Sequence, residues 1–137
     1  MTEQEQALAR RAVACEGWRW LPGMAAVDRH GVRGRILIIE DLQYNVANRA
    51  GASWLTEKQI GRCLPDLTDP ATLGCLLALV RAAWATPAIW AEPTHDGACE
   101  VWVYAGGECL LHGFYQTEAE ALVAALEAAP SRAGGEE

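Results

Sequence analysis

The chain has 137 residues, 51% of them hydrophobic and 21% charged, which is enough apolar sequence for one globular domain with its own core. Its net charge of −7 argues against general nucleic-acid binding, because that requires many cations to replace the counterions of phosphate. No apolar run reaches the roughly 18–20 residues that cross a bilayer, and residues 1–11 lack the apolar region of a signal peptide. We therefore expect a soluble cytoplasmic protein that does not bind membranes, with its five scattered cysteines reduced.

The charge is distributed unevenly along the chain. Residues 9–35 carry six arginines against two carboxylates, whereas residues 92–137 carry nine carboxylates against one arginine. Such an asymmetry can steer a charged partner toward one part of the surface, or it can simply keep the chain soluble.

The N-terminal residues have the signals of a helix. Thr2 and Glu5 form a T-x-x-E capping box, in which each residue can satisfy an amide near the other. Residues 2–15 therefore predict a helix, and Gly17 ends it.

Two strands are predicted next. Residues 18–27 begin with alternating indoles like a strand, and residues 35–39 form the strongest β-branched run of the chain, which is typical of a buried strand. Residues 40–63 have no clean period apart from a short helical turn at residues 56–62.

The clearest helix signals lie in residues 64–87. Asp69 suits the N-cap because its carboxylate can accept hydrogen bonds from the first-turn amides, and Pro70 follows at the first helical position. Apolar side chains then recur at helical spacing until Thr86-Pro87, where the residue before the proline is driven out of the helical region. The apolar stripe comprises Leu73, Leu76, Leu77, Val80 and Trp84.

Residues 87–97, which contain two prolines, predict a loop. Residues 98–104 and 109–115 predict a hairpin, since the glycine pair between them supplies the positive φ angles of a tight turn. With a two-residue turn and no bulge, Tyr104 faces Cys109 and the following pairs continue in step. Those pairs are Val103 with Leu110, Val101 with His112, and Cys99 with Phe114. The face expected to pack on the central helix carries Cys99, Val101, Val103, Leu110, His112 and Phe114. The opposite face carries Glu100, Trp102, Tyr104, Cys109, Leu111 and Tyr115.

A second capping-box pattern, Thr117 with Glu120, predicts a closing helix over residues 117–129. Runs of helix and hairpin, rather than alternating β-α-β units, favour a single α+β domain over residues 1–130. We expect a small antiparallel sheet packed against a central helix, with N- and C-terminal flanking helices. The sheet is expected to comprise residues 18–27, 35–39 and 98–115, and residues 131–137 are expected to form a disordered tail.

The sequence contains none of the common nucleotide, zinc-protease, hydrolase or EF-hand motifs, so we expect no enzyme, no catalytic residue and no cofactor. The weak metal candidates are His95, Cys99, Cys109 and His112. All four are residue types that bind zinc, but their spacing matches no familiar finger. Strand alternation also turns Cys109 away from Cys99 and His112, unless a one-residue bulge changes the register. A Cys99 nucleophile activated by His112 is a further alternative, and ordinary sheet positions explain the same residues.

Two sets of side chains are candidate binding residues. The first set is Trp18, Trp20, Arg33 and Arg35. The second set is Trp102, Tyr104 and Tyr115. The first set could stack on single-stranded nucleic acid, anchor a protein interface, or divide between the core and the solvated surface. Exposure of either aromatic group in a contiguous patch would mark an interaction surface.

Three blocks resemble a known group of proteins. ACEGWRWLPGM (14–24), LPDLTDPATLGCLLALVRAAW (64–84) and TEAEALVAALEAAP (117–130) are similar to blocks in uncharacterised small hypothetical proteins of bacteriophages and prophages, and together they cover about a third of the chain. The resemblance implies a phage origin and expression in a bacterial host cytoplasm, and it brings no catalytic residues with it.

Taken together, these features predict a non-enzymatic phage-encoded accessory protein that binds a host protein. A host defence component is the expected target, in an anti-CRISPR-like or other anti-defence role. The alternative is a nucleic-acid-associated module that uses the basic and aromatic residues 9–35, and a third hypothesis is a small metal-binding or Cys-dependent enzyme. The six tryptophans would also provide the surface for a homodimer.

Overall fold

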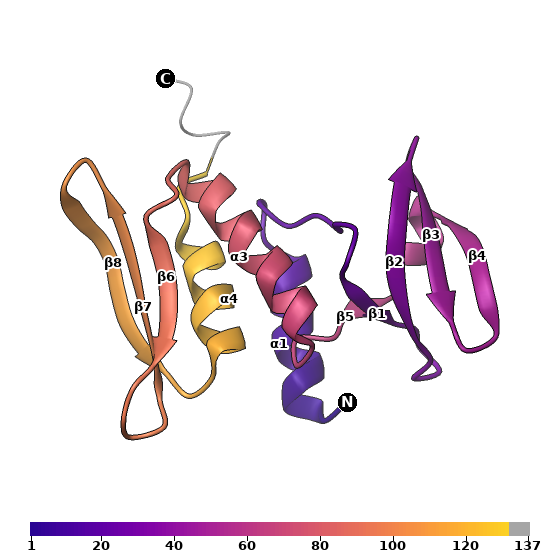
Figure 1. Cartoon of the computed structure of the whole chain (residues 1–137), viewed down its shortest axis with the longest axis horizontal. Helices are drawn as coiled ribbons and strands as arrows, with labels where there is room; N and C mark the ends of the chain where they lie inside the picture. Colours follow the sequence, from indigo (N-terminus) through magenta and orange to yellow (C-terminus); the bar gives the residue numbers. More distant parts are fainter. Residues whose placement is uncertain (132–137) are drawn as a thin grey trace. The chain divides into compact units, whose positions relative to one another are not determined.

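The computed structural model describes residues 1–131 and has four helices and two antiparallel sheets in that range (Figure 1). The predicted α+β class is confirmed. The chain groups into two compact units. The first comprises Met1–Val13 and Trp20–Cys75, and the second comprises Ala14–Arg19 and the residues from Leu76 onward. Whether the chain folds as the single domain expected over residues 1–130 stays a prediction.

The first unit is built on a five-stranded sheet of order β4-β3-β2-β1-β5. Its strands are β1 (Ala25–Val27), β2 (Arg33–Glu40), β3 (Gln43–Asn48), β4 (Gly51–Thr56) and β5 (Leu64–Pro65). Its helices are α1 (Glu3–Val13), the short α2 (Glu57–Ile60) and the first turns of α3 (Pro70–Trp84). The alternation of β3 turns Tyr44 and Val46 inward, where they are buried with Ile36 of β2 and Ile60 of α2. These apolar side chains form the core on the inner face of the sheet.

Helix α3 begins and ends for identifiable local reasons. The backbone amide of Thr72 donates to Asp69 Oδ2 at 2.9 Å, so the predicted N-cap is confirmed. At the other end, Ala85 has a φ of +56°, and the amides of Ala85 and Thr86 donate to the carbonyls of Ala82 and Arg81. This is a Schellman motif with alanine in the left-handed position that glycine usually occupies.

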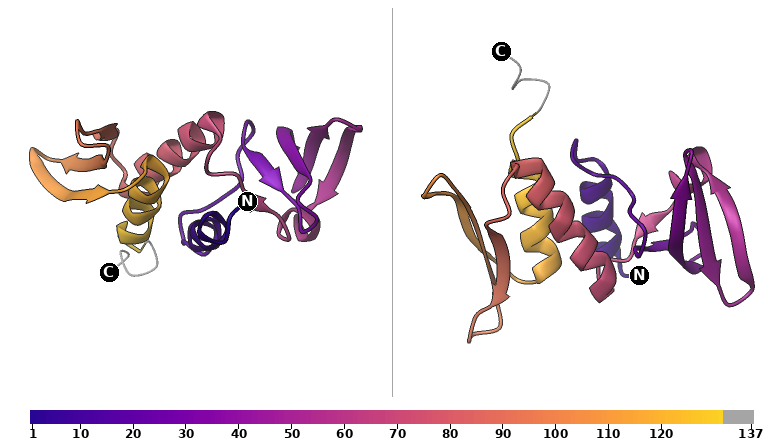
Figure 2. Two further views of the ribbon diagram at one scale, coloured as in Figure 1. Left: turned by 90° about the horizontal axis from the view of Figure 1, so that it is seen from below. Right: turned by 45° about the horizontal axis from the view of Figure 1, so that its top comes forward.

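The second unit contains a three-stranded sheet of order β6-β7-β8 and helix α4. Its elements are β6 (Ile89–Pro93), β7 (Cys99–Ala105), β8 (Glu108–Tyr115) and α4 (Glu118–Ala128). Helix α4 contacts all three strands, and Figures 1 and 2 show it along one face of this sheet. Its buried side chains, such as Leu122, pack with the inward residues Val101 and Val103 of β7, all of which are fully buried. In the same views, no helix or strand of residues 14–19 and 76–131 lies on the other face.

The expectation of one sheet was wrong, because the strands divide between two. The physical reason is that local hairpins complete each sheet. Residues 40–63, which have no clear sequence pattern, supply β3, β4 and α2, and the predicted loop at residues 87–97 supplies β6. Strand β2 therefore pairs with β1 and β3, and the 98–115 hairpin pairs with β6 instead.

The other predicted elements correspond to observed ones with shorter bounds. The helix at residues 2–15 is α1, and the helix at residues 117–129 is α4. Of the strand at residues 18–27, only Ala25–Val27 pairs. The predicted tail, residues 131–137, falls outside the described residues except for Ser131. In the described part of the chain, no helix is both long enough and apolar enough to span a membrane.

Candidate functional site

A β-bulge in β8 determines which side chains reach the solvent-facing side of the second sheet. The predicted pair of Tyr104 with Cys109 is observed, but the register then shifts by one residue, and Val103 pairs with Leu111. Leu110 is the extra residue on β8. Since two residues of one strand then oppose one residue of the other, every later side chain of β8 changes face.

The predicted pairs beyond the turn are therefore wrong, and so is the composition of the two faces. His112 pairs with Trp102, and Phe114 pairs with Glu100, so both rings lie on the outer face. Tyr115 pairs with the buried Cys99 on the inner face, which contradicts its predicted place beside Trp102.

The inner position of Tyr115 is supported by its neighbour two residues back. A Cβ placed on Gly113 would lie 3.0–3.3 Å from atoms of the Tyr115 ring, so the glycine gives this ring room. Beyond the bulge, positions 111, 113 and 115 of β8 share one face because side chains alternate along a strand. Tyr115 thus packs on the face that α4 covers.

The outer face of the β6-β7-β8 sheet carries a continuous group of rings, which we call the aromatic face. It comprises Trp90 of β6, Trp102 and Tyr104 of β7, and His112 and Phe114 of β8. Trp90 lies 5.8 Å from Trp102 and 5.7 Å from Tyr104 between ring centroids. His112 lies 5.4 Å from Trp102, nearly parallel to it at 9°, and 5.2 Å from Phe114. These separations are within the range of favourable aromatic pairs.

The aromatic face is open to solvent. Trp90 is 40% exposed and Phe114 is 62% exposed. Trp102 and Tyr104 are half-buried, and both contact the ring of Trp90. Large aromatic side chains normally go to cores or interfaces, so a connected exposed group of them indicates an interaction surface.

Two carboxylates lie on the same outer side of the sheet. Glu92 of β6 is directly opposite Glu100 of β7, two pairs along from Trp90 and Trp102 and so on the same face. Glu100 Oε2 lies 2.5 Å from His112 Nε2, while no ion pair of Glu92 with a basic side chain occurs within residues 1–131. The surface is therefore aromatic in its centre and acidic at one end.

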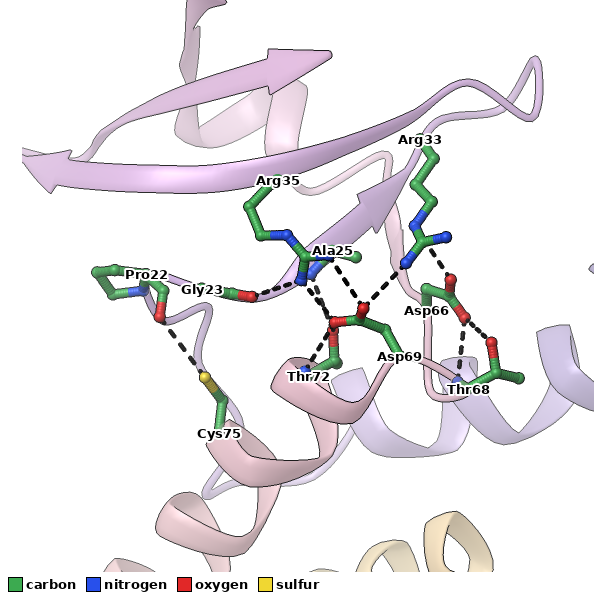
Figure 3. Close-up of polar contacts among 10 residues, drawn as sticks. All are labelled: Pro22, Gly23, Ala25, Arg33, Arg35, Asp66, Thr68, Asp69, Thr72 and Cys75. Atoms are coloured by element: carbon green, nitrogen blue, oxygen red, sulfur yellow. Dashed lines mark hydrogen bonds and ion pairs between the residues drawn. The ribbon is translucent and has the colours of Figure 1, made fainter. Parts of the chain in front are cut away.

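Arg33 and Arg35, the two arginines of the first set, form ion pairs within the first unit (Figure 3). Arg35 donates to both carboxylate oxygens of Asp69, at 2.6 and 3.0 Å, and also to the carbonyl of Gly23 at 2.9 Å. Arg33 donates to Asp69 Oδ1 at 2.9 Å and pairs with Asp66 at 3.3 Å. Bidentate arginine–carboxylate pairs of this kind fix geometry as well as charge.

The same carboxylate caps α3 and connects it to β1. The Thr72 hydroxyl donates to Asp69 Oδ2 at 2.9 Å and accepts from the amide of Ala25 at 2.9 Å. The hydrogen bond from Arg35, helped by those from Thr72, holds the pKa of the Asp69 carboxyl well below its usual range. The pKa of Arg35 is raised by the same hydrogen bond. The arrangement supports a structural role for Arg33 and Arg35.

The two tryptophans of the first set do not form an exposed patch. Trp18 and Trp20 are both half-buried. Trp18 lines a cavity of about 310 Å³ in the second unit, together with Arg19 and residues of α3 and α4. Both tryptophans are less exposed than Trp90.

Arginines of the basic segment also line a groove of about 710 Å³ in the first unit. Its lining includes Arg10, Arg29, Arg33 and Arg62. Three carboxylates, from Glu5, Asp28 and Asp66, line the same groove. The groove thus has mixed charge, which weakens its attraction for phosphate.

The four weak metal candidates are separated by the observed register. Cys99 is buried on the inner face, and burial raises the pKa of its thiol. His112 lies on the outer face, Cys109 is exposed near the turn, and His95 lies in the exposed loop before β7. Over residues 1–131, no group of three or more His, Cys, Asp or Glu side chains is arranged to hold a metal ion.

Sequence reasoning missed Trp90, Glu92 and Phe114 as surface residues. Strand β6 was expected to be part of a loop because of the two prolines in residues 87–97, although the β-branched Ile89 and the aromatic Trp90 are residue types that favour strands. The position of Phe114 depends on the bulge, which no residue of the hairpin predicts.

The first unit has exposed apolar side chains as well, among them Leu37, Ile38, Leu42 and Trp54.

No protein-family model, curated protein or solved structure matches the chain. Function is therefore inferred from the chemistry of the aromatic face itself.

Proposed function

We propose that the protein is non-enzymatic and acts by binding another protein through the aromatic face. The observation that supports this most directly is the continuous contact of five rings on the side of the β6-β7-β8 sheet opposite α4. Tryptophan and other aromatic side chains supply a large share of the binding energy in protein interfaces. No helix or strand of residues 14–19 and 76–131 packs over these rings.

The arrangement of the rings favours a preformed surface. Each ring contacts at least one other, and three of the five, Trp90, Trp102 and His112, are paired directly across the three strands. Rings held in this way lose little conformational entropy when a partner binds, because their rotamers are already restricted. Such a surface can bind a protein partner without a cofactor or a metal ion.

The identity of the partner class follows from the resemblance of residues 14–24, 64–84 and 117–130 to phage proteins. On that basis we propose that the protein is phage-encoded, acts in the cytoplasm of a bacterial host, and binds a host protein. A defence component is the host target that such an accessory protein would engage.

The alternative is a nucleic-acid-associated module that uses the basic segment. The groove lined by Arg10, Arg29, Arg33 and Arg62 is the observation that favours it. Binding of this kind would weaken steeply with salt, because phosphate contacts release counterions.

The experiment is an affinity capture with the tagged full-length protein from a bacterial host lysate, with and without nuclease, followed by mass spectrometry. Wild type is compared with Trp90→Ala, Phe114→Ala and the control Trp54→Ala. Trp54 is 48% exposed on β4 of the first unit, so its removal is a matched loss of an exposed indole that is not part of the aromatic face. Circular dichroism of each variant verifies that it is folded.

The proposal expects a nuclease-resistant partner that is lost with Trp90→Ala or Phe114→Ala and kept with Trp54→Ala. Recovery that nuclease abolishes would support the alternative instead. A partner retained equally by all three variants would contradict the assignment of the aromatic face. Sedimentation of the purified protein tests self-association, and a homodimer that Trp90→Ala dissociates would show that the face is covered by a second copy.

A further inference from the structure

We propose that the aromatic face receives an arginine-bearing segment of its partner, with a guanidinium stacked on Trp90 and paired with Glu92. This inference rests on the proposed function, since it names the chemistry of the partner that occupies the same surface. The evidence for this inference is a contact within the aromatic face, where a planar nitrogen-containing ring already lies beside an indole and a carboxylate.

That contact is made by His112. Its ring lies nearly parallel to Trp102, at 9° and 5.4 Å between centroids. Its Nε2 lies 2.5 Å from Glu100 Oε2. A planar nitrogen-bearing ring is therefore held between an indole face and a carboxylate, which is also the arrangement that a guanidinium favours.

The register repeats this pair of residues on the neighbouring strand. Trp90 is directly opposite Trp102, and Glu92 is directly opposite Glu100. Strand β7 has β8 beyond it, and β8 supplies His112 to the Trp102–Glu100 pair. Strand β6 is at the edge of the sheet, so no further strand of this sheet supplies a ring to the Trp90–Glu92 pair. A partner side chain approaching this edge would take the corresponding place.

The carboxylates themselves favour a cation at this position. Glu92 and Glu100 are like charges placed directly opposite each other, and such cross-strand pairs are destabilising. A guanidinium beside Glu92 would offset that repulsion. The exposed Trp90 ring adds cation–π attraction, which is strongest for tryptophan among the aromatic side chains.

The wider charge distribution points the same way. Residues 82–131 contain seven carboxylates and no lysine or arginine. This acidic segment attracts a basic segment of a partner and repels phosphate. The aromatic face is therefore suited to a basic protein segment rather than to single-stranded nucleic acid, although both stack on aromatic rings.

The test is a titration of the ¹⁵N-labelled full-length protein with a short capped peptide that carries two arginines between glycines. A second peptide has citrulline in place of each arginine, which keeps the shape but removes the charge, and an oligothymidine is the third probe. Chemical-shift changes of the tryptophan indole N–H groups report binding. Glu92→Gln is compared with Glu108→Gln, which removes the same charge at the β7–β8 turn.

We expect the Trp90 indole signal to shift on addition of the arginine peptide, with affinity at least about fivefold higher than for the citrulline peptide. Glu92→Gln should weaken arginine-peptide binding about threefold to tenfold, and Glu108→Gln should change it by less than about twofold. Equal affinities for the two peptides, an unchanged affinity in Glu92→Gln, no shift at Trp90, or tighter binding of oligothymidine at Trp90 would each overturn the inference.

These outcomes are distinguishable from failure of the proposed function. If a lysate partner depends on Trp90 but the arginine and citrulline peptides bind alike, the binding surface stands and its cationic occupant is wrong. If no captured protein depends on Trp90, the proposed function fails whatever the peptides do.

Discussion

Asp69 connects more parts of the first unit than any other side chain we describe, so its substitution gives the sharpest stability prediction. Its carboxylate caps α3 through Thr72 and receives hydrogen bonds from Arg33 and Arg35 of β2. Asp69→Asn keeps a good N-cap, because asparagine and aspartate are comparable there, but it removes the charge that faces the two guanidinium groups. Asp69→Ala removes both.

The expected loss in the free energy of unfolding depends on how deeply Asp69 and its two arginine partners are buried. Hydrogen bonds to charged groups contribute about 1.5–3 kcal/mol each when buried. The Asp69 side chain is only 6% exposed, but those of Arg35 and Arg33 are 38% and 51% exposed, so solvent reduces the contribution of each pair. We therefore expect Asp69→Asn to lower the free energy of unfolding by about 2–3 kcal/mol at neutral pH. Asp69→Ala should cost about 1 kcal/mol more through loss of the cap.

The effect has a defined pH dependence. Because the folded-state pKa of Asp69 is depressed, its contribution to stability is fully present above the unfolded-state pKa of about 3.9. It is lost as the pH falls from there toward the folded-state value. The difference in unfolding free energy between wild type and Asp69→Asn should therefore shrink progressively on acidification below about pH 4.

Urea denaturation of the full-length protein at several pH values measures this difference. Asp66→Asn is the control, since it removes a carboxylate whose ion pair with Arg33 is longer, at 3.3 Å, and the expected loss is below about 1 kcal/mol. The reasoning is refuted if Asp69→Asn unfolds within about 0.5 kcal/mol of wild type, or if the difference between them is the same at pH 3 as at pH 7.

Three further predictions concern backbone geometry and packing, and urea denaturation checks each of them. Leu42 has a φ of +61° in the β2–β3 turn and is 65% exposed, so Leu42→Gly should raise stability by about 1 kcal/mol, and a loss would show that the leucine makes a stabilising contact. Ala85→Gly should likewise add about 0.5–1 kcal/mol at the end of α3, with an unchanged or lower midpoint arguing against the left-handed cap. Gly34→Ala should destabilise by about 1–3 kcal/mol, because its Cβ would lie 2.5 Å from Val46 Cγ1, and a neutral result would mean that β3 readily moves away.

Local signals in the sequence were sufficient to predict where α1, α3 and α4 begin. The capping box of α1 is present in both directions, with Thr2 and Glu5 exchanging hydrogen bonds of 2.9 and 3.0 Å. Thr117 accepts from the amide of Glu120 at the start of α4. These features depend on residues three positions apart, so the chain itself specifies them. The same holds for the N-cap at Asp69.

The pairing of distant segments could not be predicted in the same way. The contact of Arg35 with Asp69 joins residues 34 positions apart, and no periodicity reports it. One extra residue at Leu110 was enough to move His112 and Phe114 to the outer face. Because register errors of a single residue exchange the two faces of a strand, the candidate site was only partly predictable. Trp102 and Tyr104 were placed correctly on the outer face, while Tyr115 was not.

The most direct test of the binding surface is the affinity of the captured partner, once purified, for wild type, Trp90→Ala and Trp54→Ala, measured by calorimetry. Our account predicts that Trp90→Ala weakens binding by about tenfold or more, as expected for an interface tryptophan, while Trp54→Ala stays within about twofold of wild type. Equal affinities for wild type and Trp90→Ala, or a larger loss with Trp54→Ala, would contradict the assignment of the aromatic face as the binding surface.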